Sequence, residues 1–500
     1  MSLAKKVAHN TLIQIAGKIV STILGLFALA LITRYLGLND FGEYTTVMTF
    51  LTFFAVIADL GLMVVTMQMI SGHHNQEEEN KIINNLFGFR LVTALICFAF
   101  APLIILLFPY SPAIKLGVII SLATFFFPSL NQVIVGLFQK RLSMDRDVVA
   151  EVVSRLVLIV GIFAAKELQA GFNGILIATG ASSFANFICH YLLAVKFVAI
   201  KPVFNWTIWK KIISKSWPLT ITIVFNLIYL RADILILSLF RGADEVGLYG
   251  AAYKIIDVLT ALPFMFGALI LPIITTAWLD NNPAYFKKVL QKSFDFMAIV
   301  AIPLVIGAQF LGQPLMSLVA GRDFIAAGGI LQILIFAVAA IFLGTMFSYA
   351  VIAMDKQKKM IGFYAFTSAT SLIAYLILIP RFSYLGAAAV TIYSEVLIGL
   401  FAAYCLFKYS RWLPGIKTFL KVLFSGAVMG GFLYFLAIGR YLGILELILI
   451  ISAASLIYFS SLYLIGGIKP EDLAAIFSRS REKNTPPYNP GDELGSGTGL

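Results

Sequence analysis

Long apolar runs follow one another from near the N-terminus to about residue 466. Each is about twenty residues or longer, the length that an α-helix needs to cross the hydrocarbon core of a bilayer. Because lipid offers no partners for backbone N–H and C=O groups, such runs form helices. The pattern predicts an all-α polytopic membrane protein. About fourteen candidate spans lie near residues 11–36, 42–70, 84–109, 113–138, 147–167, 171–198, 217–240, 246–276, 289–311, 327–354, 360–380, 384–407, 417–436 and 441–466.

The distribution of charge agrees with this prediction and indicates an orientation. Only 12% of residues are charged, whereas roughly a quarter are charged in a typical soluble domain. Alternate loops carry clusters of cations, at residues 5–6, 140–146, 201–215, 287–292, 356–359 and 408–421, and the loops between them carry single cations. The positive-inside rule therefore predicts a protein of the cytoplasmic membrane with both termini in the cytoplasm. The net charge of +12 needs no nucleic-acid partner.

The chain also repeats itself. "RYLGLNDFGEY" at 34–44 corresponds to "LFRGADEVGLY" at 239–249, so that Gly42 aligns with Gly247. Weaker matches follow in the same order. The pattern indicates two six-helix halves of the same orientation, with a cavity between them. We predict an N-terminal lobe at 1–200, a C-terminal lobe at 201–407, two additional helices at 408–468 and a disordered tail at 469–500.

Three cations lie deep inside predicted spans: Lys18 in the first, Arg231 in the seventh and Lys254 in the eighth. Arg231 belongs to the stretch "LIYLRADILIL". An ionisable residue inside a span costs roughly 2.5–3.5 kcal/mol on insertion scales, so it normally faces a cavity or a partner. One interpretation is that these cations bind an anion, ideally a phosphate. The other is that they form ion pairs that only fix helix packing.

The carboxylates inside spans have two possible roles. Asp59, Asp233 and Asp257 could take up a coupling H⁺ or Na⁺, or they could serve as counter-ions. Lys254 and Asp257 lie three positions apart on one helical face and can pair locally. Arg231 and Asp233 point to different sides of their helix, so they face different surroundings.

Two further patterns limit the chemistry. Glu151 and Arg155 are four residues apart, a spacing that favours a salt bridge near the membrane surface. The four histidines show no metal-binding spacing, and the GxxxxGK[ST] motif for phosphate binding is absent. Apart from a coupling ion, no cofactor is expected.

Several segments resemble one known family. "RYLG" at 34–37, followed by Phe41, Gly42 and Tyr44, and "DLGL" at 59–62 are similar to the start of polysaccharide and O-antigen flippases. "RADILILSLFRGADEVGLYGAAYKI" at 231–255 is similar to a later segment of that family. The resemblance covers nearly the whole chain. It identifies the chain as a member of the multidrug/oligosaccharidyl-lipid/polysaccharide exporter superfamily.

The resemblance implies a fold and a function. The fold is a V of two six-helix lobes that opens alternately to each side. The implied activity is transfer of an undecaprenyl-diphosphate-linked oligosaccharide to the outer leaflet, for O-antigen, capsule or exopolysaccharide synthesis. A polysaccharide polymerase is implied as a further partner. The family pattern implies cavity cations at Lys18, Arg231 and Lys254, with Asp233 orienting Arg231 or exchanging a coupling ion. The several arginines that the lipid II flippase branch has in its first two spans are absent here.

Two other classes of function compete with this one. A cation-coupled multidrug or small-molecule antiporter of the same fold would rely on carboxylates in the N-terminal lobe. Asp59 agrees with that function, whereas the cations deep in the spans do not. A membrane enzyme would need an acid, base or metal site near one face. The predicted outer loops are too short for such a site and concentrate no carboxylates or histidines, so we expect a transporter.

Overall fold

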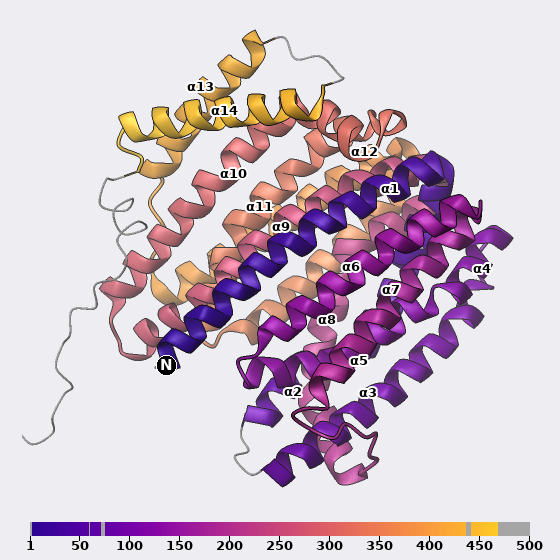
Figure 1. The fold of residues 1–500 in the computed structure, drawn as a ribbon. Coiled ribbons are helices and arrows are strands. Elements are labelled where there is room, and N and C mark those ends of the chain that lie inside the picture. The colour runs from indigo at the N-terminus through magenta and orange to yellow at the C-terminus, as the bar shows by residue number, and fades with distance from the viewer. Residues whose placement is uncertain (1–2, 60, 72–75, 437–441, 469–500) are drawn as a thin grey trace, which may run out of the picture.

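The computed structural model describes residues 3–59, 61–71, 76–436 and 442–468, and these are almost entirely helical (Figure 1). The helices of the first half are α1 (Leu3–Asp59), α2 (Leu62–Ser71), α3 (Gln76–Ile105), α4 (Pro112–Ile120), α5 (Leu122–Lys140), α6 (Met144–Glu167) and α7 (Gly171–Ala194). Those that follow are α8 (Trp206–Phe240), α9 (Ala243–Leu279), α10 (Pro283–Val319), α11 (Ala327–Ala353), α12 (Ile361–Ser410), α13 (Lys417–Phe435) and α14 (Ile444–Leu464). Short 3₁₀ turns η1 (Arg322–Phe324) and η2 (Gln357–Met360) flank α11. The predicted all-α class is confirmed.

Helix α12 folds back on itself at Ser383, whose φ of 53° and ψ of −136° lie outside the helical region. Pairs of residues placed about equally before and after Ser383 contact one another. The hydroxyl groups of Tyr375 and Thr391 are 3.3 Å apart, and the rings of Phe363 and Phe401 stack with centroids 4.2 Å apart. The two parts of α12 are therefore antiparallel and cross the membrane separately.

Helix α1 folds back in the same way at Gly37, whose φ is 72°. A straight helix would separate Lys18 from Asp59 by about 60 Å at 1.5 Å per residue. Instead, Lys18 and Gln132 line one cavity, and Arg90 donates hydrogen bonds to both Gln132 and Asp59. The two ends of α1 thus lie at a similar depth, and the turn between them uses the left-handed conformation that glycine adopts readily.

These two hairpins explain the number of membrane crossings. By length and composition, twelve helical segments can span a membrane, and Ala16–Asp59 and Gln357–Ser410 are each counted as one. Counting each hairpin as two crossings gives fourteen within the described residues, in agreement with the sequence pattern.

One helix begins well before its apolar run. α8 starts at Trp206 rather than near residue 217, because the side chain of Asn205 accepts hydrogen bonds from the backbone N–H groups of Thr207 and Ile208. Trp209 then packs edge-on against Phe89 of α3. A polar N-cap and an aromatic contact therefore extend the helix beyond the part that hydropathy detects.

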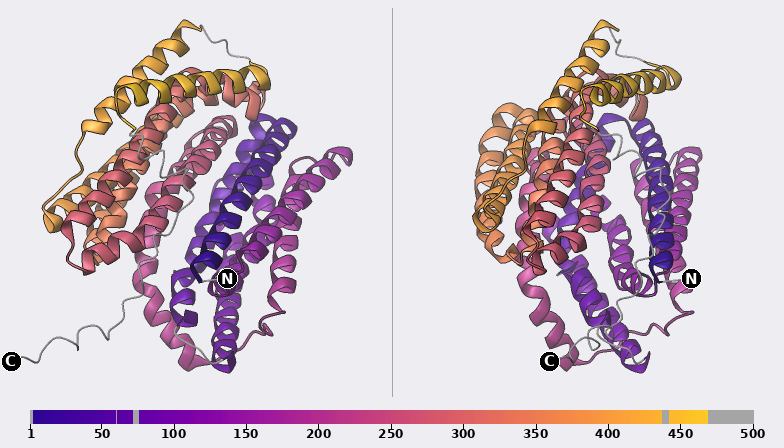
Figure 2. Two further views of the ribbon diagram at one scale, coloured as in Figure 1. Left: turned by 60° about the vertical axis from the view of Figure 1, so that its left-hand side comes forward. Right: turned by 90° about the vertical axis from the view of Figure 1, so that its left-hand side faces the viewer.

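The helices form two groups with a peripheral pair (Figure 2). α1–α7 make one group and α8–α12 the other, and α13 and α14 pack on α10 at the outer side of the second group. One buried hydrophobic cluster joins α1 and α6 to α8 and α9. The divisions near residues 200, 407 and 468 stay a prediction, and the tail at 469–500 lies outside the described residues.

The two lobes touch closely where α1 crosses α9, next to the Gly37 turn. A Cβ atom added to Gly42 would lie 1.8 Å from the carbonyl oxygen of Ala243, and one added to Gly247 would lie 2.4 Å from that of Leu38. Gly42 and Gly247 are the residues that the repeat aligns. The repeated segments therefore pack against one another across the lobe interface, and glycine permits the approach of the two backbones.

We expect Gly42→Ala to destabilise the protein. The new methyl group would meet a backbone oxygen that no side-chain rotation can move, and overpacking of this kind typically costs about 1–3 kcal/mol. The matched control is Gly307→Ala in α10, where an added Cβ meets nothing within 4 Å. Thermal unfolding of the purified protein should show a lower midpoint for Gly42→Ala only. Equal midpoints for both variants would contradict the close crossing.

Candidate functional site

A cavity of about 420 Å³, here called the interlobe cavity, lies between α1 and α6 of one lobe and α9 of the other. Its charged lining consists of three cations, Lys18, Arg155 and Lys254, and one carboxylate, Asp257. The formal charge of the lining is therefore positive. Tyr44, Ser21 and Thr22 add hydroxyl groups. Two of the three predicted cations thus share one cavity, and each comes from a different lobe.

Arg155 is a cation of this cavity, although its spacing from Glu151 predicts an ion pair near the membrane surface. The expected partner, Glu151, pairs instead with Lys18 at 3.1 Å. The guanidinium group of Arg155 lies over Gly25 of α1, where an added Cβ would be 3.6 Å from its central carbon. The expectation of a Glu151–Arg155 pair is wrong because α1 packs along α6 and presents Lys18 to Glu151.

Arg231 lies between two further cavities, next to the interlobe cavity. Its Nη2 atom is 2.6 Å from Oδ1 of Asp257, and its guanidinium group lies over the ring of Tyr253, 4.8 Å from the centroid. The side chains of Arg231 and Asp257 are 30% and 34% exposed, so both groups of the pair remain accessible from a cavity. Asp257 therefore pairs with Arg231 from the neighbouring helix, in addition to lying one turn from Lys254.

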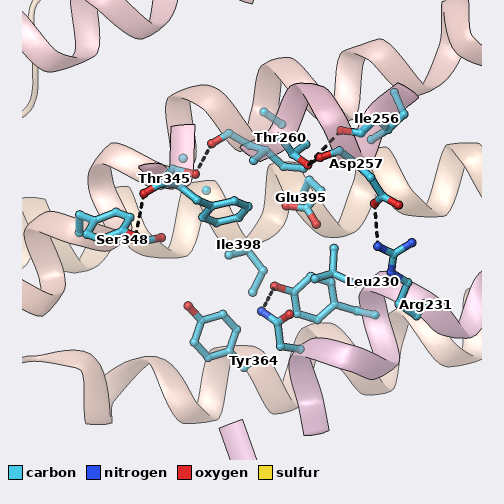
Figure 3. A pocket seen from close by; sticks show the side chains of 18 of the residues that line it. Leu230, Arg231, Ile256, Asp257, Thr260, Thr345, Ser348, Tyr364, Glu395 and Ile398 are labelled. Atoms are coloured by element: carbon cyan, nitrogen blue, oxygen red, sulfur yellow. Dashed lines mark hydrogen bonds and ion pairs between the residues drawn. The ribbon is translucent and has the colours of Figure 1, made fainter. Parts of the chain in front are cut away.

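The Arg231–Asp257 pair separates two further cavities. A small one of about 90 Å³ lies between α1, α8 and α9 and is also lined by Lys254. A larger one of about 410 Å³, the C-lobe cavity, lies among α8, α9, α11 and α12. Figure 3 shows the pair at one side of the C-lobe cavity. Asp257 lines all three cavities, so a single carboxylate contacts each of them.

Asp233 faces different surroundings from Arg231, as their spacing along α8 predicts. It is fully buried, and its carboxylate accepts hydrogen bonds from the hydroxyl groups of Tyr249, at 2.6 Å, and Thr391, at 3.4 Å. Asp257, and not Asp233, makes the ion pair with Arg231, and the other role expected of Asp233, exchange of a coupling ion, stays a prediction. The lining of the three cavities described above does not include Asp233.

Asp59 pairs with Arg90, a residue that the sequence analysis did not single out. The side chain of Arg90 is fully buried and also donates hydrogen bonds to the backbone carbonyls of Ala58 and Ser129. This geometry favours the counter-ion interpretation of Asp59. The sequence signal was available, because Arg90 lies inside the predicted span 84–109.

Glu395 is a second residue to which the sequence analysis assigned no role. It is only 8% exposed and lines the C-lobe cavity, and its Oε1 atom has no hydrogen-bond partner among the described residues. Figure 3 shows its carboxyl group on the same side of the cavity as Thr260 and Asp257. The C-lobe cavity therefore carries one acidic group beyond the Arg231–Asp257 pair.

The arrangement is suited to binding an anion. Cations from α1, α6, α8 and α9 lie at the interlobe cavity and the small cavity beside it, and arginine can hold a phosphate through two parallel hydrogen bonds. The cavity is bounded by helices of both lobes, so a bound group would contact both. No group of three or more metal-ligating side chains occurs among the residues that the structure describes.

Comparisons with known proteins agree with this picture. Residues 7–278 match the model of a family described as polysaccharide biosynthesis protein. A Shigella dysenteriae protein named as a candidate O-antigen transporter is 22% identical over 374 residues, which cover 74% of this chain and 92% of that one. A Haloferax volcanii protein named as a candidate flippase, AglR, is 23% identical over 46% of this chain and 49% of its own length. The chain thus spans about half of that archaeal relative.

Solved structures show the same fold. The lipid II flippase MurJ in an inward closed conformation superposes with a TM-score of 0.75 at 18% identity, over 91% of this chain and 98% of that one. An inward-facing multidrug resistance transporter of the MATE family, in the MOP superfamily, gives a TM-score of 0.63 at 17% identity, over 79% and 97%. The predicted fold of two six-helix lobes with two additional helices is confirmed. These relatives are named as transporters and not as enzymes.

We expect Asp59→Ala to destabilise the protein by a few kcal/mol, because it leaves the guanidinium group of Arg90 buried without its carboxylate. Breaking a buried pair typically costs about 3–5 kcal/mol, and the 18% exposure of Asp59 places this pair at the lower end. Adding Arg90→Met should recover part of the loss, as measured by thermal unfolding. A stable Asp59→Ala protein that has lost transport would instead indicate that Asp59 binds a coupling ion.

Proposed function

The chain belongs to the polysaccharide biosynthesis protein family, and from that premise we propose that it is a flippase for polyprenyl-diphosphate-linked oligosaccharide. The observation that carries this proposal is the lining of the interlobe cavity, with three cations and one carboxylate drawn from both lobes. A diphosphate is the part of such a substrate that requires positive charge. The polyprenyl chain can stay in the bilayer while the headgroup occupies the cavity.

The close crossing of α1 and α9 supports transport by alternating access. The lobes are in backbone contact beside Gly37, whereas the lining of the interlobe cavity extends along α1 to Lys18, far from that crossing. By the positive-inside rule, the basic loops predict that the Gly37 end faces the outside of the cell. We propose that the protein lies in the cytoplasmic membrane with both termini in the cytoplasm. In the described conformation the space between the lobes is then closed at the outer end.

Asp257 is the best candidate for coupling to an ion gradient. It neutralises Arg231 and also lines the cavity that contains Lys254. An anion that binds Arg231 competes with Asp257, and the displaced carboxylate can then take up H⁺ or Na⁺. The proposal assigns binding of the substrate to Arg231, Lys254 and Lys18, and exchange of the coupling ion to Asp257.

The antiporter of soluble substrates is less well supported. That function was expected to rely on carboxylates of the N-terminal lobe, and Asp59 is engaged by Arg90 there. The interlobe cavity instead carries more cations than carboxylates. A polysaccharide polymerase that acts on the exported glycan is the partner we propose for the flippase.

The test is transfer of a polyprenyl-diphosphate oligosaccharide between the leaflets of proteoliposomes. We expect Lys254→Gln and Arg231→Gln each to lower the transfer rate about ten- to a hundredfold, because a hydrogen bond to a charged group contributes about 1.5–3 kcal/mol. The matched control is Lys288→Gln on α10, which removes an exposed lysine outside the cavities. The readout is accessibility of the glycan to a lectin or glycosidase on the far side.

Three outcomes are distinguishable. Loss in both cavity variants with normal transfer in the control supports the proposal. Normal transfer in all variants would leave Arg231 and Lys254 with a packing role only. The absence of transfer by the unaltered protein, together with uptake of a soluble cation, would favour the antiporter.

A further inference from the structure

A second polar cavity, of about 360 Å³, lies beside the interlobe cavity and is here called the amide cavity. It is bounded by α1, α5, α6 and α7, and Met265 of α9 lines it from the other lobe. Lys18 lines both cavities. The amide cavity therefore adjoins the cationic lining of the interlobe cavity at Lys18. Its volume lies within the roughly 300–1,000 Å³ typical of pockets for small ligands.

Carboxamide groups are the distinctive part of its lining. Asn131 and Gln132 of α5 and Asn186 of α7 face it. The amide nitrogen of Asn131 donates to the side-chain oxygen of Asn186 at 2.6 Å, and that of Asn186 donates to the carbonyl of Ala150 at 3.0 Å. The side-chain oxygen of Asn131 has no hydrogen-bond partner among the described residues, although Asn131 is only 5% exposed. A buried acceptor without a donor is costly, and because this oxygen is itself buried, that cost is relieved only if a ligand hydroxyl reaches it from the cavity.

Both carboxylates of this cavity, Asp147 and Glu151, already have a partner. Lys18 contacts Glu151 at 3.1 Å, and the Nε2 atom of His190 lies 3.0 Å from Oδ1 of Asp147. The lining thus presents amides and two carboxylates that each have a partner, in contrast to the cationic lining of the interlobe cavity. Carboxamides both donate and accept hydrogen bonds, as sugar hydroxyl and acetamido groups do.

We propose that the amide cavity binds the sugar that is attached directly to the diphosphate, and that it selects a neutral sugar over a sugar acid. This inference rests on the proposed function. The diphosphate occupies the interlobe cavity, and Lys18 at the shared boundary places the first sugar against Asn131. A carboxylate on that sugar would face Asp147 and Glu151, while Lys18 is engaged by the diphosphate.

The test measures binding to the full-length protein in lipid nanodiscs. The probes are a polyprenyl diphosphate that carries one neutral hexose, the same lipid with one hexuronic acid, and the bare diphosphate lipid. We expect the unaltered protein to bind the hexose lipid about tenfold more tightly than either of the others, which corresponds to one or two net hydrogen bonds.

Two variants address the amide cavity. Asn131→Leu keeps a similar volume and removes the hydrogen-bonding groups, and Val135→Phe fills the cavity from an apolar position in its lining. Each should abolish the preference for the hexose lipid and leave the affinity for the bare diphosphate unchanged. The matched control is Gln309→Leu, since Gln309 makes amide contacts between α10 and α11 outside both cavities. It should retain the preference.

The outcomes separate this inference from the proposed function. Equal affinity of the unaltered protein for the hexose and bare lipids would overturn the sugar site while the flippase proposal stands. A preference that survives in both Asn131→Leu and Val135→Phe would also overturn it. If no diphosphate lipid binds and Lys254→Gln changes nothing, the proposed function itself fails.

Discussion

The architecture depends on the close contact between two backbones. Gly42 and Gly247 occupy equivalent positions in the repeat and lie against the backbone of the opposite lobe. With side chains at these positions, α1 and α9 would separate, and the cavities that they bound would change shape. Because the contact lies near the Gly37 turn, the lobes are held together at one end. The binding groups lie further along the same helices, where a small rotation about the crossing produces a larger displacement.

Much of the fold could be predicted because membrane helices are specified by composition over about twenty residues. The hairpins of α1 and α12 followed from the lengths of the apolar runs, and the two lobes followed from the repeat. The membrane span predicted at 217–240 leaves out the first turns of α8, because Asn205 acts through local hydrogen bonds, which a hydropathy window averages away. The contact between Gly42 and Gly247 was equally out of reach, since an alignment of repeats does not say that equivalent segments touch.

The site was predicted less completely, because a charge in a span is visible in the sequence and its partner is not. Lys18 and Lys254 do line one cavity, and Arg231 lies beside it. Their partners depend on how each helix is rotated and which helix lies next to it. Spacing along one helix predicts an ion pair between Glu151 and Arg155. Packing between helices instead brings Lys18 to Glu151, and these two form the ion pair. Asn131 was overlooked for a different reason: an amide has no net charge, so it does not stand out within an apolar run.

The Arg231–Asp257 pair has a consequence for the strength of binding. An anion that binds Arg231 as proposed competes with a carboxylate that is 2.6 Å away, so its net gain in free energy is reduced by the loss of that ion pair. A site built in this way recognises negative charge without retaining it. In the proposed function the substrate must be released on every cycle. A site that exchanges one anion for another favours release more than an arginine without a partner does. In the proposed transport cycle, Asp257 would thereby limit how long the substrate stays bound.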